Sequence, residues 1–242
     1  IEVLRGPGAL MYGGSAVGGV VNVIDTRIPQ ERLFDAKGGV AGKLNLEGSS
    51  GDASRSAAAL LETGTDRFAL HADAFNRRSG DVAVPIALAC EKPGAPTIAN
   101  AICNSSAQTQ GGALGGSVFF DHSRLGASVS SYSSNYGTVA EDAVTIGMRS
   151  TRAALEWDVD QLTGWFQNVK VRASQTDYQH TEFEGEEAGT VFKSKGNDLR
   201  ITTSATITTH SQRYAVLASI GITCARATIT AAAANRLTKN GN

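Results

Sequence analysis

Apolar and polar side chains alternate with a period of two from residue 38 onward, and this pattern constrains the fold more than any other feature. Val40, Leu44 and Leu46, for example, alternate with Lys43 and Asn45. Successive side chains of a strand point to opposite faces, so each such segment predicts a strand with one apolar and one polar face. The sequence therefore predicts an all-β chain with an open, curved, antiparallel sheet. The expected strands are residues 38–49, 53–65, 66–79, 108–121, 125–135, 147–159, 164–182, 192–209 and 212–222, with Leu44, Leu70, Leu155 and Val171 on the outer face.

The connections between these segments alternate in length. Short links are expected at 64–66, 121–125 and 158–164, and long polar links at 80–108, 134–146 and 182–191. Barrels of the bacterial outer membrane alternate tight turns with extended loops in this way. A soluble β-sandwich has an overlapping strand signature but does not require the alternation, and it is the alternative fold.

Composition excludes several classes of protein. The chain has 27 glycines, 41% hydrophobic and 6% aromatic residues, which suits thin strands and turns better than a dense core. A formal net charge of -1 gives no electrostatic footprint for nucleic acid. No apolar run approaches the roughly eighteen residues of a spanning helix. A transmembrane β-barrel needs no such run.

The first 24 residues combine glycine-dense turns with a strand-like end. Pro7 after Gly6 suits the first turn of a short helix that begins at Pro7, and residues 9–12 are compatible with one or two helical turns, which two following glycines would stop. Gly18 and Gly19 then allow close backbone approach before a β-branched segment that suits a buried strand. A nucleotide-binding loop is excluded, because the glycine spacing of a dinucleotide site and the lysine of a phosphate loop are both missing.

This segment resembles the end of the plug domain of TonB-dependent outer-membrane receptors. The resemblance rests on Arg5, Gly6, Pro7, Tyr12, Gly13, Gly18, Gly19 and Asn22. It implies a partial transmembrane antiparallel β-barrel preceded by the C-terminal end of a plug. The corresponding division is 1–25 for the plug end, 26–37 for a hinge, 38–222 for the N-terminal part of the barrel, and 223–242 for an atypical tail.

Arg5 is the single charged residue between Glu2 and Asp25, so an interior position would require a carboxylate partner. In the family, such a plug arginine faces acidic residues of the barrel wall. Glu47 and Glu62, on strands close in sequence to the hinge, are the candidate partners. A solvated surface arginine is the alternative.

The resemblance implies energised uptake of a scarce ligand, such as a metal or metal chelate, across the bacterial outer membrane. The expected partners are the TonB complex, outer-membrane lipid and the small ligand, with no enzymatic activity and no cofactor. About nine strands are too few for a barrel that encloses a plug, which takes about 22, so we expect a fragment. In the family, the segment that TonB binds lies at the N-terminus ahead of this part of the plug, so the resemblance implies that the fragment alone cannot couple to TonB. A structural or adhesive β-protein of the cell surface and a hydrolase on a β-scaffold are the alternatives.

Sequence-local chemistry is sparse. No G-x-S-x-G surrounds any serine, and His71, His122, His180 and His210 have no H-x-x-x-H spacing. His180 lies beside Asp177 in an acidic stretch that could hold a divalent cation, although a solvated loop has the same composition. Residues 79–85 and 177–180 resemble the branch of the family that includes zinc-uptake receptors, but this chain lacks that branch's histidine-rich loop.

The three cysteines differ in their surroundings. Cys90 and Cys103 lie in one long loop, an easy span for a disulfide in an oxidising exterior. Cys224 is unpaired in the tail, where the alternation is lost and the usual terminal aromatic is missing. We expect a truncation or a frame disruption near Ile222, with an atypical strand as the alternative.

Overall fold

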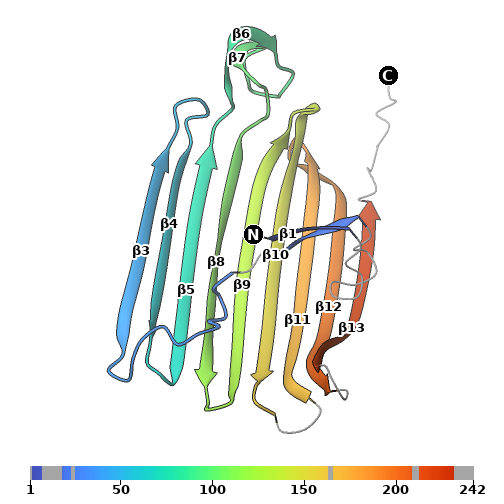
Figure 1. Cartoon of the computed structure of the whole chain (residues 1–242). Helices are drawn as coiled ribbons and strands as arrows, with labels where there is room; N and C mark the ends of the chain where they lie inside the picture. The colour runs from blue at the N-terminus through green and yellow to red at the C-terminus, as the bar shows by residue number, and fades with distance from the viewer. Residues whose placement is uncertain (1, 7–17, 23–24, 163–165, 209–212, 232–242) are drawn as a thin grey trace.

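The computed structural model describes residues 2–6, 18–22, 25–162, 166–208 and 213–231 (Figure 1). Nine strands form one sheet in the order β3-β4-β5-β8-β9-β10-β11-β12-β13, and every neighbouring pair is antiparallel. The strands are β3 (Gly39–Gly48), β4 (Arg55–Gly64), β5 (Phe68–Ser79), β8 (Ala107–Phe119), β9 (Ser123–Thr138), β10 (Glu141–Val159), β11 (Phe166–Glu184), β12 (Glu187–Thr208) and β13 (Arg213–Ala231).

Each of these strands overlaps one of the nine expected from the sequence, so the predicted open antiparallel sheet is confirmed. Among the described residues, no helix is long and apolar enough to cross a membrane.

A separate hairpin precedes the sheet. It pairs β1 (Glu2–Arg5) with β2 (Gly19–Asn22), and the amide of Gly6 donates to the carbonyl of Gly18 at 3.2 Å. Gly6 has φ of 96°, which favours glycine, and a Cβ on Gly19 would lie 2.7 Å from the carbonyl oxygen of Leu4. The strand expected after the paired glycines is present as β2, but the expected burial is wrong, because Val21 is 66% exposed and β1 is its one partner among the described residues. The expected short helix, with Pro7, Tyr12 and Gly13, lies outside the described residues.

The two faces of the large sheet differ in chemistry. We call the face that residues 25–37 contact the inner face, and the opposite one the outer face. Directly paired residues share a face, and the pairing places Leu70, Leu155, Ala173 and Leu199 in one row of the outer face. The next row toward the short turns contains Phe68, Val118, Leu125, Trp157, Val171, Ile201 and Ile220.

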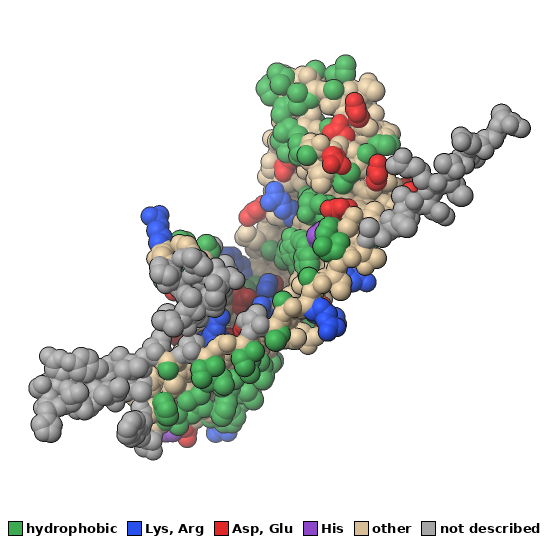
Figure 2. Space-filling model, turned by 90° about the vertical axis from the view of Figure 1, so that its right-hand side faces the viewer, with side chains coloured by type: hydrophobic (Ala, Val, Ile, Leu, Met, Phe, Trp, Pro, Cys, Tyr) green, Lys and Arg blue, Asp and Glu red, His purple; other side chains and the backbone are tan. Residues whose placement is uncertain are grey.

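These apolar side chains remain uncovered. Leu44, Leu70 and Leu155 are 68%, 50% and 48% exposed, and Val171 is half-buried on the same face. The four predicted outer-face residues therefore share one face. Figure 2 shows hydrophobic side chains gathered over the lower part of the molecule, with charged side chains in the hollow above them. A continuous exposed apolar face of this kind requires an apolar partner.

The sheet has two ends. The links 65–67 and 120–122 lie at the end with short turns, while the excursion 80–106 lies at the other end with β6 (Ala83–Ala89) and β7 (Ile98–Ala101). The long links expected at 134–146 and 182–191 are wrong. There β9 and β10 extend to a turn at 139–140, and β11 and β12 to one at 185–186, because paired polar side chains also stabilise neighbouring strands.

The expected strand end at Ile222 is also wrong. β13 continues to Ala231, and Thr190 of β12 is paired with Ala231. The β-branched residues Thr228, Ile229 and Thr230 favour a strand there even though the apolar alternation has ended. Residues 232–242 lie outside the described part of the chain.

Candidate functional site

The segment 25–37, which we call the linker, crosses the inner face and is held there. Ile28 and Pro29 are buried in this contact. Two glycines of the sheet make the close approach possible. A Cβ at Gly115 would collide with the carbonyl oxygen of Arg27, and one at Gly126 would collide with the side chain of Ile28. The missing side chains of these two glycines therefore leave the space on the inner face in which the linker lies.

Arg124 is the centre of the linker contact. It is only 6% exposed, and its Nη1 donates to the carbonyl of Pro29 at 3.2 Å and to Ser117 Oγ at 3.3 Å. Its Nη2 donates to Gln30 Oε1 at 3.0 Å, to Glu156 Oε2 at 2.7 Å, and to Asp158 Oδ2. The guanidinium of Arg124 thus connects β8 and β10 to the backbone and a side chain of the linker.

The partners of Arg124 are themselves connected. Ser117 Oγ donates to the Pro29 carbonyl at 2.7 Å, and Gln30 Nε2 donates to Glu156 Oε2 at 2.8 Å. Arg172 on the next strand donates from Nε to Glu156 Oε1 at 3.3 Å. Multiple hydrogen bonds of this kind are what make a buried ion pair tolerable. We call Arg124, Glu156, Asp158 and Gln30 the linker clamp.

Sheet register explains how the clamp assembles. Arg124 of β9 is paired directly with Asp158 of β10, so both side chains point to the inner face. Glu156 is paired with Gly126, whose missing side chain leaves room for the linker. One positive charge faces two carboxylates, and Arg172 supplies the second cation.

A second charged group lies beside the linker on β4 and β5. His71 is buried, with Nδ1 3.0 Å from Glu62 Oε1 and Nε2 3.1 Å from Asp73 Oδ2. Arg27 of the linker approaches Asp73 Oδ2 at 3.6 Å. This group adds an ionic contact between the linker and the sheet.

The structure does not bring together Arg5 and its expected partners. Arg5 is exposed on β1 and makes no ion pair with a described residue, whereas Glu62 contacts His71 and Glu47 accepts a hydrogen bond from Asn45 at 3.1 Å. The expected contact of Arg5 is therefore not present among the described residues, and the carboxylates of the sheet that contact the linker are Glu156, through Gln30, and Asp73, through Arg27.

The expected metal ligands do not meet either. His180 and Asp177 are three positions apart in β11, so they point to opposite faces. On the inner face, His180 Nδ1 lies 3.0 Å from the Tyr178 hydroxyl, and its ring stacks on Phe192 with centroids 4.3 Å apart. Asp177 lies 3.1 Å from Lys195 Nζ on the outer face. The two residues cannot hold one ion.

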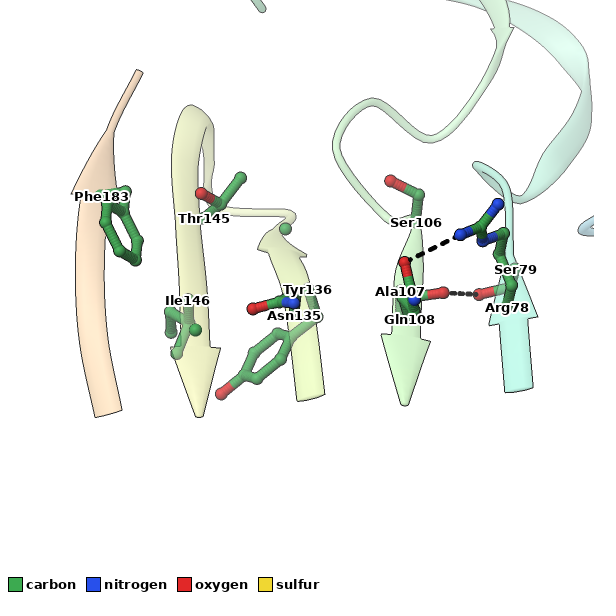
Figure 3. Close-up of a pocket in the computed structure, with 12 residues that line it drawn as sticks. Arg78, Ser79, Ser106, Ala107, Gln108, Asn135, Tyr136, Thr145, Ile146 and Phe183 are labelled. Atoms are coloured by element: carbon green, nitrogen blue, oxygen red, sulfur yellow. Dashed lines mark hydrogen bonds between the residues drawn. The ribbon is translucent and has the colours of Figure 1, made fainter. Parts of the chain in front are cut away.

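A pocket of about 380 Å³ lies near the loop end of the sheet. Arg78, Gln108, Asn135, Thr145 and Phe183 line it, as Figure 3 shows. Arg78 Nη2 donates to Gln108 Oε1 at 3.2 Å, which leaves most of the guanidinium donors free for another acceptor.

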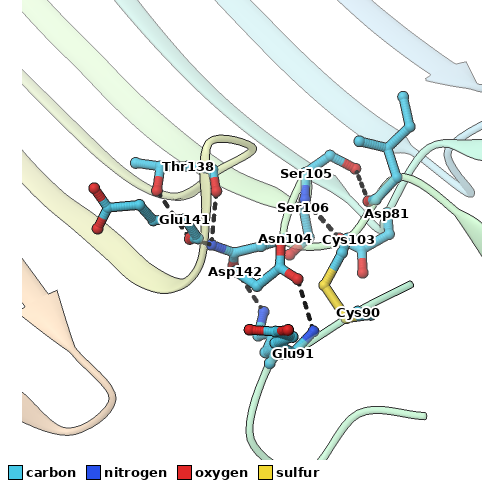
Figure 4. The surroundings of a disulfide bond; sticks show 12 residues. Asp81, Cys90, Glu91, Cys103, Asn104, Ser105, Ser106, Thr138, Glu141 and Asp142 are labelled. Carbon is cyan, nitrogen blue, oxygen red and sulfur yellow. Dashed lines mark hydrogen bonds between the residues drawn. A yellow bond between two sulfur atoms is a disulfide. The ribbon is translucent and has the colours of Figure 1, made fainter. Parts of the chain in front are cut away.

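The excursion 80–106 is fixed by a disulfide and by a buried asparagine (Figure 4). Cys90 and Cys103 are bonded, with Cα atoms 5.4 Å apart, as the sequence predicts. The side-chain nitrogen Nδ2 of fully buried Asn104 donates to the backbone carbonyls of Thr138, Glu141 and Val144. The excursion is thereby attached to the β9–β10 hairpin.

The same cysteines form the one His/Cys/Asp/Glu group of possible metal-binding geometry found among the described residues, together with Asp142. Their sulfur atoms are joined to each other, so they offer no thiolate to a metal. Cys224 is a free, exposed thiol on the outer face of β13.

Comparison with known structures shows the fold. The chain is similar to the copper transporter OprC, with a TM-score of 0.65 and 12% identity over 94% of this chain and 33% of that one. A second match, the ferric yersiniabactin uptake receptor FyuA from Yersinia pestis, has 9% identity over 94% of this chain and 48% of that one. Its TM-score of 0.34 is too low to support a structural argument. No protein-family model matches the sequence.

The chain therefore has the fold of part of the OprC chain and spans a third of its length. This likeness establishes an all-β architecture with a large antiparallel sheet. The zinc-uptake branch suggested by two short segments is not confirmed.

Proposed function

We propose that this chain is part of a TonB-dependent outer-membrane receptor for energised uptake of a metal or metal chelate. In this proposal, residues 1–25 end the plug domain, 26–37 connect it to the barrel, and the sheet from residue 38 is the first part of the barrel wall. The barrel part runs past residue 222, because β13 continues to Ala231.

The observation that carries the proposal is the linker clamp on a sheet whose two faces differ in chemistry. A soluble sheet covered on one side by a strap would still have to bury its other face. Here the outer face exposes rows of leucine, valine, isoleucine and aromatic residues, while the inner face pairs charges with the linker. A barrel wall with lipid outside and a polar, element-filled lumen inside requires this combination.

The partners follow from that architecture. The resemblance of residues 1–24 to the plug end implies the TonB complex as the source of energy, and the apolar rows imply outer-membrane lipid. The similarity to OprC favours a metal-related ligand. Neither Asp177 nor His180 identifies that ligand, because they lie on opposite faces of β11.

The test uses the complete receptor in its own bacterium. Cells with and without TonB are compared for accumulation of labelled copper, zinc and an iron chelate, in the presence and absence of the receptor gene. We expect the receptor in the outer-membrane fraction and uptake of one of these ligands that requires both receptor and TonB. Recovery in the soluble fraction, or receptor-dependent surface adhesion with no TonB-dependent uptake, would instead show a structural or adhesive β-protein.

A further inference from the structure

Cationic side chains follow the apolar rows on the outer face, toward the loop end of the sheet. Three consecutive rows of directly paired residues contain them. The only acidic residue that the structure describes in the regularly paired part of this face is Asp177, which contacts Lys195. We call this set the cationic girdle: Arg55, Arg78, Arg149, Lys193, Lys195 and Arg226.

The girdle is exposed to solvent and is almost entirely cationic. All six cationic side chains are exposed, and the apolar rows between them and the short turns contain no charged residue among the described positions. The inner face of the same strands mixes both signs, as the linker clamp shows. A sheet that needed only solubility would not separate its charges in this way.

Two arginines of the girdle are directly opposed. Arg55 of β4 is paired with Arg78 of β5, and neither makes an ion pair with a described residue. Like charges opposite each other on neighbouring strands are destabilising. A bound anion that bridges the two guanidinium groups would turn this repulsion into attraction.

The pocket beside this pair belongs to the same face. Gln108, Asn135 and Gly147 continue the row of Arg78, and Thr145 and Phe183 form the next row with Gly137 (Figure 3). Gly147 keeps the floor open, because a Cβ there would lie 3.2 Å from both Asn135 Oδ1 and Phe183 Cε2. The pocket thus offers a guanidinium, two side-chain amides and a hydroxyl next to an aromatic ring.

From this arrangement we propose that the girdle and its pocket bind the phosphate-bearing headgroups of outer-leaflet lipids. The proposal rests on the outer-membrane location in the proposed function. Phosphate oxygens would accept hydrogen bonds from Arg55 and Arg78, and the attached polar headgroup would occupy the pocket. The acyl chains would lie on the apolar rows directly beyond the girdle, where Leu61, Leu114 and Val129 are exposed.

This continuity selects a lipid over a free anion. Phosphate alone would gain the girdle contacts but would leave the adjoining apolar rows uncovered. A phosphorylated lipid satisfies both surfaces with one molecule, since basic residues beside an apolar membrane face attract anionic headgroups. The transported ligand is not the occupant, because the girdle lies on the face opposite the linker.

The experiment measures lipid binding by the complete receptor purified in neutral detergent. The variant Arg55→Gln/Arg78→Gln removes two girdle cations. The matched control, Lys43→Gln/Arg152→Gln, removes two exposed cations from the inner face of the same sheet. Binding of a phosphorylated outer-leaflet lipid, of a neutral lipid with the same acyl chains, and of inorganic phosphate is titrated for each protein.

We expect the girdle variant to lose affinity for the phosphorylated lipid by roughly thirtyfold, about fivefold per cation, and the control to retain it. The neutral lipid should bind all three proteins alike and more weakly. Equal affinity of the parent and girdle variant, or an equal loss in the control, would overturn the proposal. Inorganic phosphate bound as tightly as the lipid would overturn the assignment to a lipid.

Membrane fractionation separates this result from the proposed function. If the parent receptor is absent from the outer membrane, the proposed function fails. If the receptor is present there and takes up its ligand, but the girdle variant binds phosphorylated lipid as the parent does, only the lipid site fails.

Discussion

Replacing Arg124 with alanine should release the linker from the inner face of the sheet. The substitution removes every contact of the central guanidinium and leaves Glu156 and Asp158 as carboxylates with 17% and 10% exposed side chains. Removing one partner of a buried ion pair generally costs about 3 to 5 kcal/mol. Because about 1.4 kcal/mol corresponds to a factor of ten, the fraction of molecules with an open linker should rise roughly a hundredfold to a few thousandfold.

Trypsin reports this opening directly. Arg32 is the cleavage site of interest, and in the closed linker its Nε donates to the Asp66 carbonyl at 2.7 Å while its guanidinium covers the Phe119 ring at 5.5 Å. Trypsin therefore requires the linker to leave the wall. When reclosing is fast, the cleavage rate follows the open population, so the variant should be cut faster by the same factor.

Two further variants test the physical reason. Arg152→Ala removes an exposed arginine from the same face and should be cut at the parent rate. Adding Glu156→Gln and Asp158→Asn to Arg124→Ala removes the unpaired charges and should restore part of the protection. An unchanged cleavage rate in Arg124→Ala, with the wall strands still resistant to trypsin, would refute the role of the clamp.

Three other outcomes follow from the packing. Gly115→Ala should also speed tryptic cleavage of the linker, because its Cβ would collide with the linker backbone, whereas Gly196→Ala, with open space at its Cβ, should not. In the proposed membrane-inserted barrel, Val129→Lys on the outer face should lower the free energy of unfolding by about 2 to 4 kcal/mol in denaturant titrations, and the neighbouring inner-face Ser130→Lys far less. Reducing the loop disulfide should make residues 80–106 susceptible to protease without unfolding the sheet, since the bridge closes a loop of 13 residues worth about 3 kcal/mol.

The sequence predicts the sheet well because its signal is local. Within each strand, the alternation of neighbouring residues indicates which side chains share a face. The pairing between strands then aligns these faces, as in the direct pairs Leu70 with Gly116 and Leu155 with Ala127. The long hairpins above the apolar rows were missed for the same reason. Away from an apolar partner, the alternation that marks a strand is no longer required, although the backbone pairing continues.

The linker clamp could not be predicted from local pattern. Arg124 lies in the expected short turn 121–125, and its linker partners are 94 and 95 positions away. One signal was present, however. The centre of the expected connection 134–146 is residue 140, and folding a hairpin there brings Arg124 opposite Glu156, close to the observed pairing with Asp158. Hairpin symmetry therefore predicts that Arg124 lies near Glu156 and Asp158, but it does not predict the contact of Arg124 with the linker.

The separation of Asp177 and His180 follows from the geometry of a β-strand. Two ligands on one strand must be separated by an even number of positions to share a face, and the spacing of three between Asp177 and His180 excludes them. The same parity places Tyr178 beside His180 and Lys195 beside Asp177, so each residue finds a partner on its own side. In the barrel wall that we propose, parity separates residues that face the lumen from residues that face the membrane. Under that proposal, residues for a transported ligand should be sought among inner-face positions, and residues for a lipid among outer-face positions.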